Sequence, residues 1–143
     1  MFCTQIKMND RKIYEIDGAK FSTLEEFFEE ICNVVITGAE WGHNLDAFND
    51  ILRGGFGTPE EGFMIKWLNS QISKERLGYP ETVRQLEKRL KGCHASNRKY
   101  VSRDLEEAKK DQGSTVFEWL VEIIQIHCAG GEEYEDNVQL LLE

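Results

Sequence analysis

The stretch WGHNLDAFNDIL, residues 41–52, carries a helix start, an apolar stripe and two acidic side chains, and it decides how the fold is interpreted. Asn44 is a residue type that commonly caps the N-terminus of a helix. Apolar side chains then recur at helical spacing and predict a short amphipathic helix: Leu45, Phe48, Ile51 and Leu52. The glycines that follow, Gly54 and Gly55, predict where this helix ends.

Asp46 and Asp50 are four positions apart in this helix, so they share one of its faces. The helix dipole favours Asp46 in the first turn, whereas Asp50 gains little from it and repels Asp46. Two interpretations stay open. Either the pair is the solvated side of an amphipathic helix, or it offers carboxylates to a cationic cleft in place of phosphates, since both anions pair with arginine in a forked geometry. Nothing nearby indicates the buried, protonated carboxyl group that catalysis would need.

Charge is distributed unevenly along the 143 residues, whose formal net charge is −9. Residues 15–61 carry 11 acidic and 2 basic side chains, and residues 113–143 carry 7 acidic side chains and no basic ones. Residues 62–112 carry 12 basic and 7 acidic side chains, and this mixture is typical of a solvated face. An acidic protein repels the phosphates of nucleic acid and favours cationic partners, so we expect no direct nucleic-acid partner.

Hydrophobic periodicity predicts an α/β chain in which helices separate three strands. Strands are expected at residues 11–17, 62–68 and 138–142, and helices at 24–35, 44–53, 69–77, 80–93, 101–111 and 116–127. We expect the strand at 62–68 to be buried. Ser22 with Glu25 fits a capping box, and so does Thr115 with Glu118. The acidic face of the first helix is expected to be solvated: Glu25, Glu26, Glu29 and Glu30.

The remaining sequence predicts no membrane span, no cofactor and no metal site. No run of about 18 apolar residues is present, and no secretion signal is recognised, so we expect a cytoplasmic protein with free thiols at its four cysteines. Cys93–His94 and His127–Cys128 are zinc-type ligands. However, structural zinc ligands usually lie about two to four residues apart, and adjacent side chains diverge. Phosphate-binding glycine motifs are absent from the sequence.

The stretch at residues 41–52 resembles the signature segment of the barstar family, whose pattern is aromatic-Gly-x-Asn-Leu-Asp-Ala-x-x-Asp-x-Leu. The similarity covers about residues 12–78 and 113–142, and residues 79–112 look like a helical insertion in a single domain, residues 1–143. The resemblance implies a three-stranded parallel sheet packed by helices. It also implies a protein that is not an enzyme but an immunity-type inhibitor, whose acidic helix blocks the active site of a basic, secreted or toxin ribonuclease.

The resemblance further implies roles for individual residues. Asp50 would mimic a phosphate among the cations of the nuclease, and Asp46 would support it. Further partner contacts are implied at Gly42, Asn44, Leu45, Gly54 and, on the late helix, Glu122. Glu40 and Asn49 are also implied contacts, but the type member of the family has aromatics there and another near Gly55. These departures leave an alternative open: a barstar-fold interaction or regulatory module with a partner that is not a nuclease.

Overall fold

The structure is a computed structural model, and it describes residues 11–38 and 41–143. Three parallel strands form one sheet in the order β1-β2-β3: β1 (Lys12–Asp17), β2 (Phe63–Leu68) and β3 (Val138–Leu142). The helices are α2 (Leu24–Val34), α3 (Leu45–Arg53), α4 (Ser70–Arg76), α5 (Tyr79–Gly92), α6 (Arg98–Lys109) and α7 (Val116–Ile126). The predicted α/β fold is therefore confirmed. No helix in this described part of the chain is long and apolar enough to cross a bilayer.

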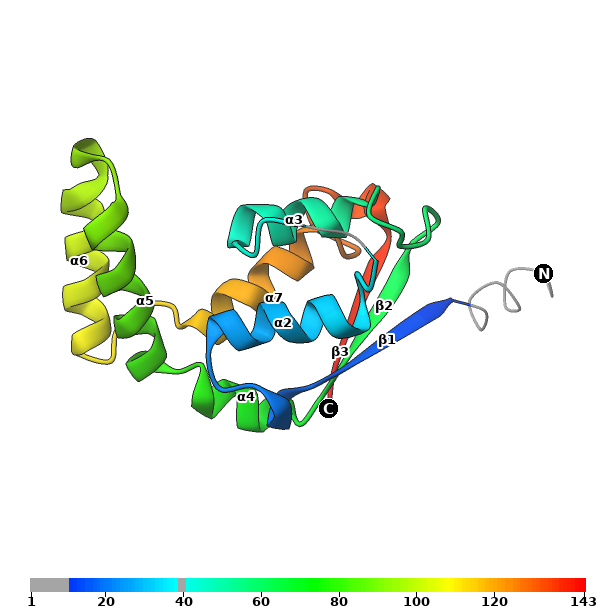
Figure 1. Cartoon of the computed structure of the whole chain (residues 1–143), viewed down its shortest axis with the longest axis horizontal. Coiled ribbons are helices and arrows are strands. Elements are labelled where there is room, and N and C mark those ends of the chain that lie inside the picture. Colours follow the sequence, from blue (N-terminus) through cyan, green and yellow to red (C-terminus); the bar gives the residue numbers. More distant parts are fainter. Residues whose placement is uncertain (1–10, 39–40) are drawn as a thin grey trace.

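The sheet buries one face. In β1 and β2, Tyr14 pairs with Ile65 and Ile16 pairs with Trp67, and all four side chains are buried. The side chains between them point the other way, and Lys66 is half-exposed. Figure 1 shows the helices on one side of the sheet. Only alternate side chains of β2 face the helices, so the expectation that the strand at 62–68 is buried is wrong for the side chains between them.

Trp67 stands at the centre of the main core and is fully buried. Its ring stacks on Phe27, with the centroids 5.4 Å apart, and packs at 5.2 Å from Phe117 on α7. Its indole N–H donates a hydrogen bond of 2.9 Å to the buried hydroxyl of Ser73, so the polar atom of the ring is satisfied. The central strand, α2, α4 and α7 are thereby joined at one side chain.

The cap of α2 lies one residue later than the sequence predicts. The hydroxyl of Thr23 accepts from the amide of Glu26 at 3.1 Å, and the Glu26 carboxylate accepts from the amide of Ser22 at 2.8 Å. The predicted capping box of Ser22 with Glu25 is therefore wrong. Because Glu26 does the capping instead, Glu25 is free to contact α5.

Two further expectations about helices have opposite outcomes. The predicted capping box at the start of α7 is confirmed, because Thr115 and Glu118 exchange hydrogen bonds between side chain and backbone. The expectation of a wholly solvated acidic face on α2 is wrong, because Glu30 is buried and accepts from the amide of Asp17 at 3.0 Å. The carboxylate of Glu30 thus joins α2 to the end of β1.

Helices α5 and α6 pair as a hairpin that projects from the body at the end farthest from the sheet (Figure 1). The hairpin has a small apolar cluster of its own: Leu86, Val101, Leu105 and Ala108. From the body, the partly buried ring of Trp119 packs against this cluster. The hairpin falls within the predicted insertion at residues 79–112, whose boundaries stay a prediction.

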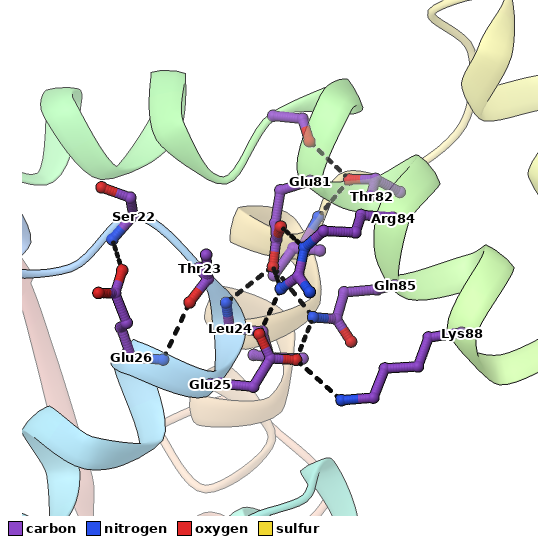
Figure 2. Close-up of polar contacts among 12 residues, drawn as sticks. Ser22, Thr23, Leu24, Glu25, Glu26, Glu81, Thr82, Arg84, Gln85 and Lys88 are labelled. Atoms are coloured by element: carbon purple, nitrogen blue, oxygen red, sulfur yellow. Dashed lines mark hydrogen bonds and ion pairs between the residues drawn. The ribbon is translucent and has the colours of Figure 1, made fainter.

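The first turn of α5 caps two helices of the body. The buried Glu81 carboxylate accepts from the amide of Leu24 at 2.9 Å, at the start of α2 (Figure 2). The hydroxyl of Thr82, which is fully buried, accepts from the amide of Val116 at 2.9 Å, at the start of α7. The opening amides of a helix have no acceptor within the helix, so these contacts fix the base of the hairpin to both helices.

A cluster of charged and polar side chains completes this junction. Arg84 donates to Glu81 at 2.7 Å and also pairs with Glu25, while Gln85 donates to both carboxylates and Lys88 to Glu25 (Figure 2). Burial by itself would raise the pKa of both glutamates. The hydrogen bonds outweigh burial, so the pKa of Glu81 lies below its usual value and that of Glu25 falls to about 2.

Candidate partner-binding site

The helix α3 is held in place by its cap and its apolar side. The Asn44 side chain accepts from the amide of Ala47 at 2.8 Å and donates to the carbonyl of Gly42 at 3.2 Å. The side chains that face the body are fully buried: Phe48, Ile51 and Leu52. The helix ends at Gly54, whose φ of 103° is a conformation that side chains rarely allow. The predicted cap, stripe and end of this helix are confirmed.

The loop before α3 is fastened to α2 through Cys32. The indole N–H of Trp41 donates to the sulfur of Cys32 at 2.8 Å, and Nε2 of His43 lies 3.0 Å from the same sulfur. The rings of Trp41 and His43 lie against each other, with centroids 4.5 Å apart. Gly42 is exposed between them, and a Cβ atom there would lie 2.9 Å from the side-chain nitrogen of Asn44. The start of α3 is therefore presented on a fixed loop.

Asp46 and Asp50 both lie on the exposed side of α3, but they differ in their contacts. No ion pair among residues 11–38 and 41–143 involves Asp46. Asp50, whose side chain is 56% exposed, accepts from Nη1 of Arg53 at 2.7 Å. The carboxylate expected to mimic a phosphate is thus held by an arginine of its own helix.

Arg53 is itself held by a second acid. Its Nε and Nη2 atoms donate to the two carboxylate oxygens of Glu133 at 2.7 and 3.1 Å, which is a forked pair. The hydrogen bond from Arg53 lowers the pKa of Glu133, and the same bond raises the pKa of Arg53. Exposed ion pairs contribute little to stability, so Asp50 can leave Arg53 for another cation at small cost.

A buried histidine, His127, joins α3 to the segment between α7 and β3. Nδ1 of His127 lies 2.6 Å from a carboxylate oxygen of Asp136, and its Nε2 lies 2.6 Å from the side-chain oxygen of Asn49. Asn49, an implied partner contact, is thus half-buried and engaged inside the protein. The resemblance implied a contact here because the type member of the family has an aromatic residue at this position, whereas the Asn49 side chain is bonded to His127 inside the protein.

The one group of three metal-type side chains in the described part of the chain is His127, Glu133 and Asp136. Both ring nitrogens of His127 are engaged, and Glu133 holds Arg53. These contacts make the group a hydrogen-bonding network in which each of the three side chains already has a partner within the protein. Cys93 and His94, considered as zinc-type ligands, lie elsewhere, where the hairpin turns from α5 to α6. The described cysteines, Cys32, Cys93 and Cys128, are free thiols.

The other implied contacts have different surroundings. Leu45 is half-buried and packs against the main core. Glu122 is exposed on α7 and lines two grooves, of about 930 and 410 Å³, neither of which includes a residue of α3. Glu40 lies outside the described residues. The acid that the structure brings next to Asp50 is Glu133, which sequence reasoning missed because it lies 80 positions beyond Arg53.

An open hollow of about 520 Å³ adjoins Asp46. The residues from His43 to Asp46 form one wall, and Gln85, Lys88 and Arg89 of α5 form part of the other. The exposed acidic face of α3 therefore borders a wall that carries two cations. Of the cations near the acidic face of α3, only Arg53 could be expected from the sequence, because it follows Asp50 at the i,i+3 spacing of helical neighbours.

Comparison with known proteins supports the resemblance. The family model described as Barstar (barnase inhibitor) matches residues 11–100, which is more than half of the chain. The match spans the strands β1 and β2 and the helices from α2 to α5. A comparison with curated proteins finds no match. The family is one of inhibitors and not of enzymes. On the strength of the matched residues and the parallel three-stranded fold, the chain belongs to the barstar family.

Proposed function

We propose that this protein inhibits a basic ribonuclease by placing the exposed face of α3 in the active site of the enzyme. The observation that carries the proposal is that Asp46 and Asp50 are both exposed on a helix whose opposite side is fully buried. Carboxylates and phosphates bind the same cations in the same forked geometry. Membership of a family described as barnase inhibitors supports this use of the helix.

The contacts of Arg53 suggest how Asp50 becomes available. When a cation of the enzyme replaces Arg53 at Asp50, Arg53 keeps its two hydrogen bonds to Glu133 and does not become unpaired. The exchange trades one exposed ion pair for a pair that the enzyme shields from water, where charge interactions are stronger. Asp46 adds a second carboxylate one turn away. Opposite charges speed such encounters, so association should be fast and should slow as salt is added.

The proposed contact surface extends to both ends of the helix. Before α3 it includes Gly42, Asn44 and Leu45, and after α3 it includes Gly54, where a Cβ atom would have no neighbour within 4 Å. The proposal leaves out Asn49, because that side chain is bonded to His127. It also leaves out Glu122, which lines grooves that α3 does not reach.

A second candidate is a barstar-fold interaction or regulatory module whose partner is not a nuclease. The internal hydrogen bond of Asn49 favours it, since this position holds no aromatic anchor that could enter an enzyme. This module would bind its partner without reducing any ribonuclease activity. Assaying RNA cleavage, in addition to binding, therefore separates the two candidates.

The test is a titration of RNA cleavage by barnase, and by basic ribonucleases from the source organism of the chain, with the wild-type protein, Asp50→Ala and Glu29→Ala. Glu29 is an exposed acid on α2 and gives the matched change in charge. We expect one-to-one inhibition by wild type and by Glu29→Ala, and inhibition at least about a hundredfold weaker by Asp50→Ala. The proposal fails if no basic ribonuclease is inhibited, or if Asp50→Ala inhibits as well as wild type.

A further inference from the structure

The tip of the α5–α6 hairpin has a composition opposite to that of the body. All 26 acidic side chains of the chain lie outside residues 88–103. Six cations lie within them: Lys88, Arg89, Lys91, Arg98, Lys99 and Arg103. A basic cluster on one projecting element of an otherwise acidic protein is the electrostatic signature of a local anion-binding surface.

Four of these cations have no ion pair within the described ranges. Lys91, Arg98 and Lys99 are exposed at the turn of the hairpin, and Arg89, also exposed, lies 5.4 Å from the centre of the Trp119 ring. Lys88 differs, because it pairs with Glu25 at 3.2 Å, and so does Arg103, which pairs with its neighbour on α6 at 3.5 Å. The uncompensated charge is therefore concentrated where the chain turns from α5 to α6.

A shallow groove of about 250 Å³ between α5 and α6 brings together two of these cations, Lys91 and Arg98. Lys109 adds a third cation to its lining, and Glu87 adds the one acid. The floor is apolar, from Leu90 and Leu105. A groove with this lining can follow a chain of phosphates, because its cations lie on both of its helices.

An exposed aromatic ring lies within the basic stretch. The side chain of Tyr100 is 50% exposed. Nζ of Lys99 lies 5.0 Å from the centre of its ring, and the guanidinium carbon of Arg103 lies 5.8 Å from it. An exposed ring flanked by cations is a stacking platform for an unpaired base, whose phosphates the cations can then bind.

The acidic body does not cancel this charge at a distance. The 14 residues of α5 span about 21 Å, whereas the screening length at physiological salt is about 8 Å. The base of the hairpin is fixed to α2 and α7 by Glu81 and Thr82 (Figure 2). Lys88 and Arg89 still line the hollow beside Asp46, whereas Lys91, Arg98 and Lys99 lie outside its lining, at the projecting end of the hairpin (Figure 1).

We infer that the tip of the hairpin binds single-stranded nucleic acid, with phosphates on Lys91, Arg98 and Lys99 and a base stacked on Tyr100. The tip cannot serve the cationic enzyme proposed for α3, because like charges repel. The exposed ring favours nucleic acid over an acidic protein surface. This inference goes beyond the proposed function and does not rest on it. For the tip of the hairpin, it replaces the expectation, drawn from the total charge of the chain, that the protein has no direct nucleic-acid partner.

The experiment is fluorescence anisotropy with labelled single strands of RNA and of DNA, each of about 12 nucleotides. The tip variant is Lys91→Gln, Arg98→Gln and Lys99→Gln together. The matched control neutralises three exposed lysines of the body: Lys12, Lys20 and Lys74. Tyr100→Ala and Tyr100→Phe test stacking. Circular dichroism and thermal unfolding establish that every variant is folded.

We expect the wild-type protein to bind at least one of the two strands. Three phosphate contacts should weaken this binding about 20-fold between about 50 and 200 mM salt. The tip variant should bind at least about tenfold more weakly, and the body control within about twofold of wild type. Tyr100→Ala should lose about fivefold or more, whereas Tyr100→Phe should keep the affinity because the ring remains.

Three results would overturn the inference. The first is that the wild-type protein binds neither strand at about 50 mM salt. The second is equal loss of affinity in the tip variant and the body control, which would reduce the effect to total charge. The third is displacement of the strand by polyglutamate as effectively as by unlabelled strand, which would make the tip a surface for acidic proteins.

Discussion

Two ion pairs with the same spacing in sequence have contrasting surroundings in this molecule, because one is exposed and the other has a buried carboxylate. Asp50 with Arg53 on α3, and Glu81 with Arg84 on α5, are both i,i+3 pairs with a nitrogen–oxygen distance of 2.7 Å. The Asp50 side chain is 56% exposed, whereas that of Glu81 is 5% exposed and also caps α2. Equal spacing in sequence thus yields an exchangeable surface pair in one helix and a structural junction in the other.

The difference teaches that the surroundings of a carboxylate, and not its partner alone, decide what it can do. A carboxylate that is buried and bonded several times cannot leave its partners without a large loss of stability. A carboxylate on an exposed face can change partners almost freely. Only the second kind is suited to capture by another protein. Variants at the two sites should therefore separate loss of folding from loss of binding.

The largest effect on stability is expected for Glu81→Ala. This change leaves the amide of Leu24 without its acceptor and removes a carboxylate from Arg84, so the free energy of unfolding should fall by about 3 kcal/mol. Glu81→Gln should lose less, because an acceptor oxygen remains. Urea titration measures both. Glu87→Ala, an exposed glutamate on the same helix, is the control and should lose less than about 0.5 kcal/mol.

A smaller effect is expected for Thr82→Ala. The buried hydroxyl accepts from the amide of Val116, and its removal leaves that amide unsatisfied at the start of α7. The expected loss in unfolding free energy is about 1–2 kcal/mol, measured by the same titration. Thr82→Ser keeps the hydroxyl and should recover part of it. Equal losses in the two variants would show that the methyl group, and not the cap, accounts for the effect.

Acid should weaken the α5 junction gradually. The folded pKa values of Glu25 and Glu81 lie below their usual value, that of Glu25 at about 2. Such groups stabilise the folded state above their unfolded pKa, and this stabilisation disappears as the pH falls toward the folded pKa. Unfolding free energy should therefore decline between about pH 5 and pH 2. The double variant Glu25→Gln, Glu81→Gln should flatten that part of the profile, and an unchanged slope would contradict the assignment.

Local signals allowed the elements to be predicted, whereas contacts between distant residues escaped sequence reasoning. Asn44 could be recognised as a cap because its hydrogen bond spans three residues. The capping box of α2 was misplaced because the adjacent Ser22 and Thr23 are equally suitable, and only the contact of Glu25 with α5 distinguishes them. The role of Glu81 depends on an amide 57 positions away, which no local pattern shows.

At the candidate site too, local features could be predicted from the sequence, whereas contacts between distant segments could not. The exposed positions of Asp46 and Asp50 follow from helical periodicity, which depends only on neighbouring residues. The forked pair of Arg53 with Glu133 and the bond of Asn49 to His127 arise where segments remote in sequence meet. Sequence could therefore indicate that Asp46 and Asp50 are exposed on this helix, but not which of its side chains the protein itself engages.

The most direct test of the account measures folding and inhibition on the same Asp50→Ala protein. Because Asp50 makes only an exposed pair, the free energy of unfolding should stay within about 0.5 kcal/mol of wild type. Inhibition of the basic ribonuclease should nevertheless be lost. A variant that unfolds as readily as Glu81→Ala, or that inhibits as strongly as wild type, would contradict the claim that α3 carries an exchangeable carboxylate for a cationic partner.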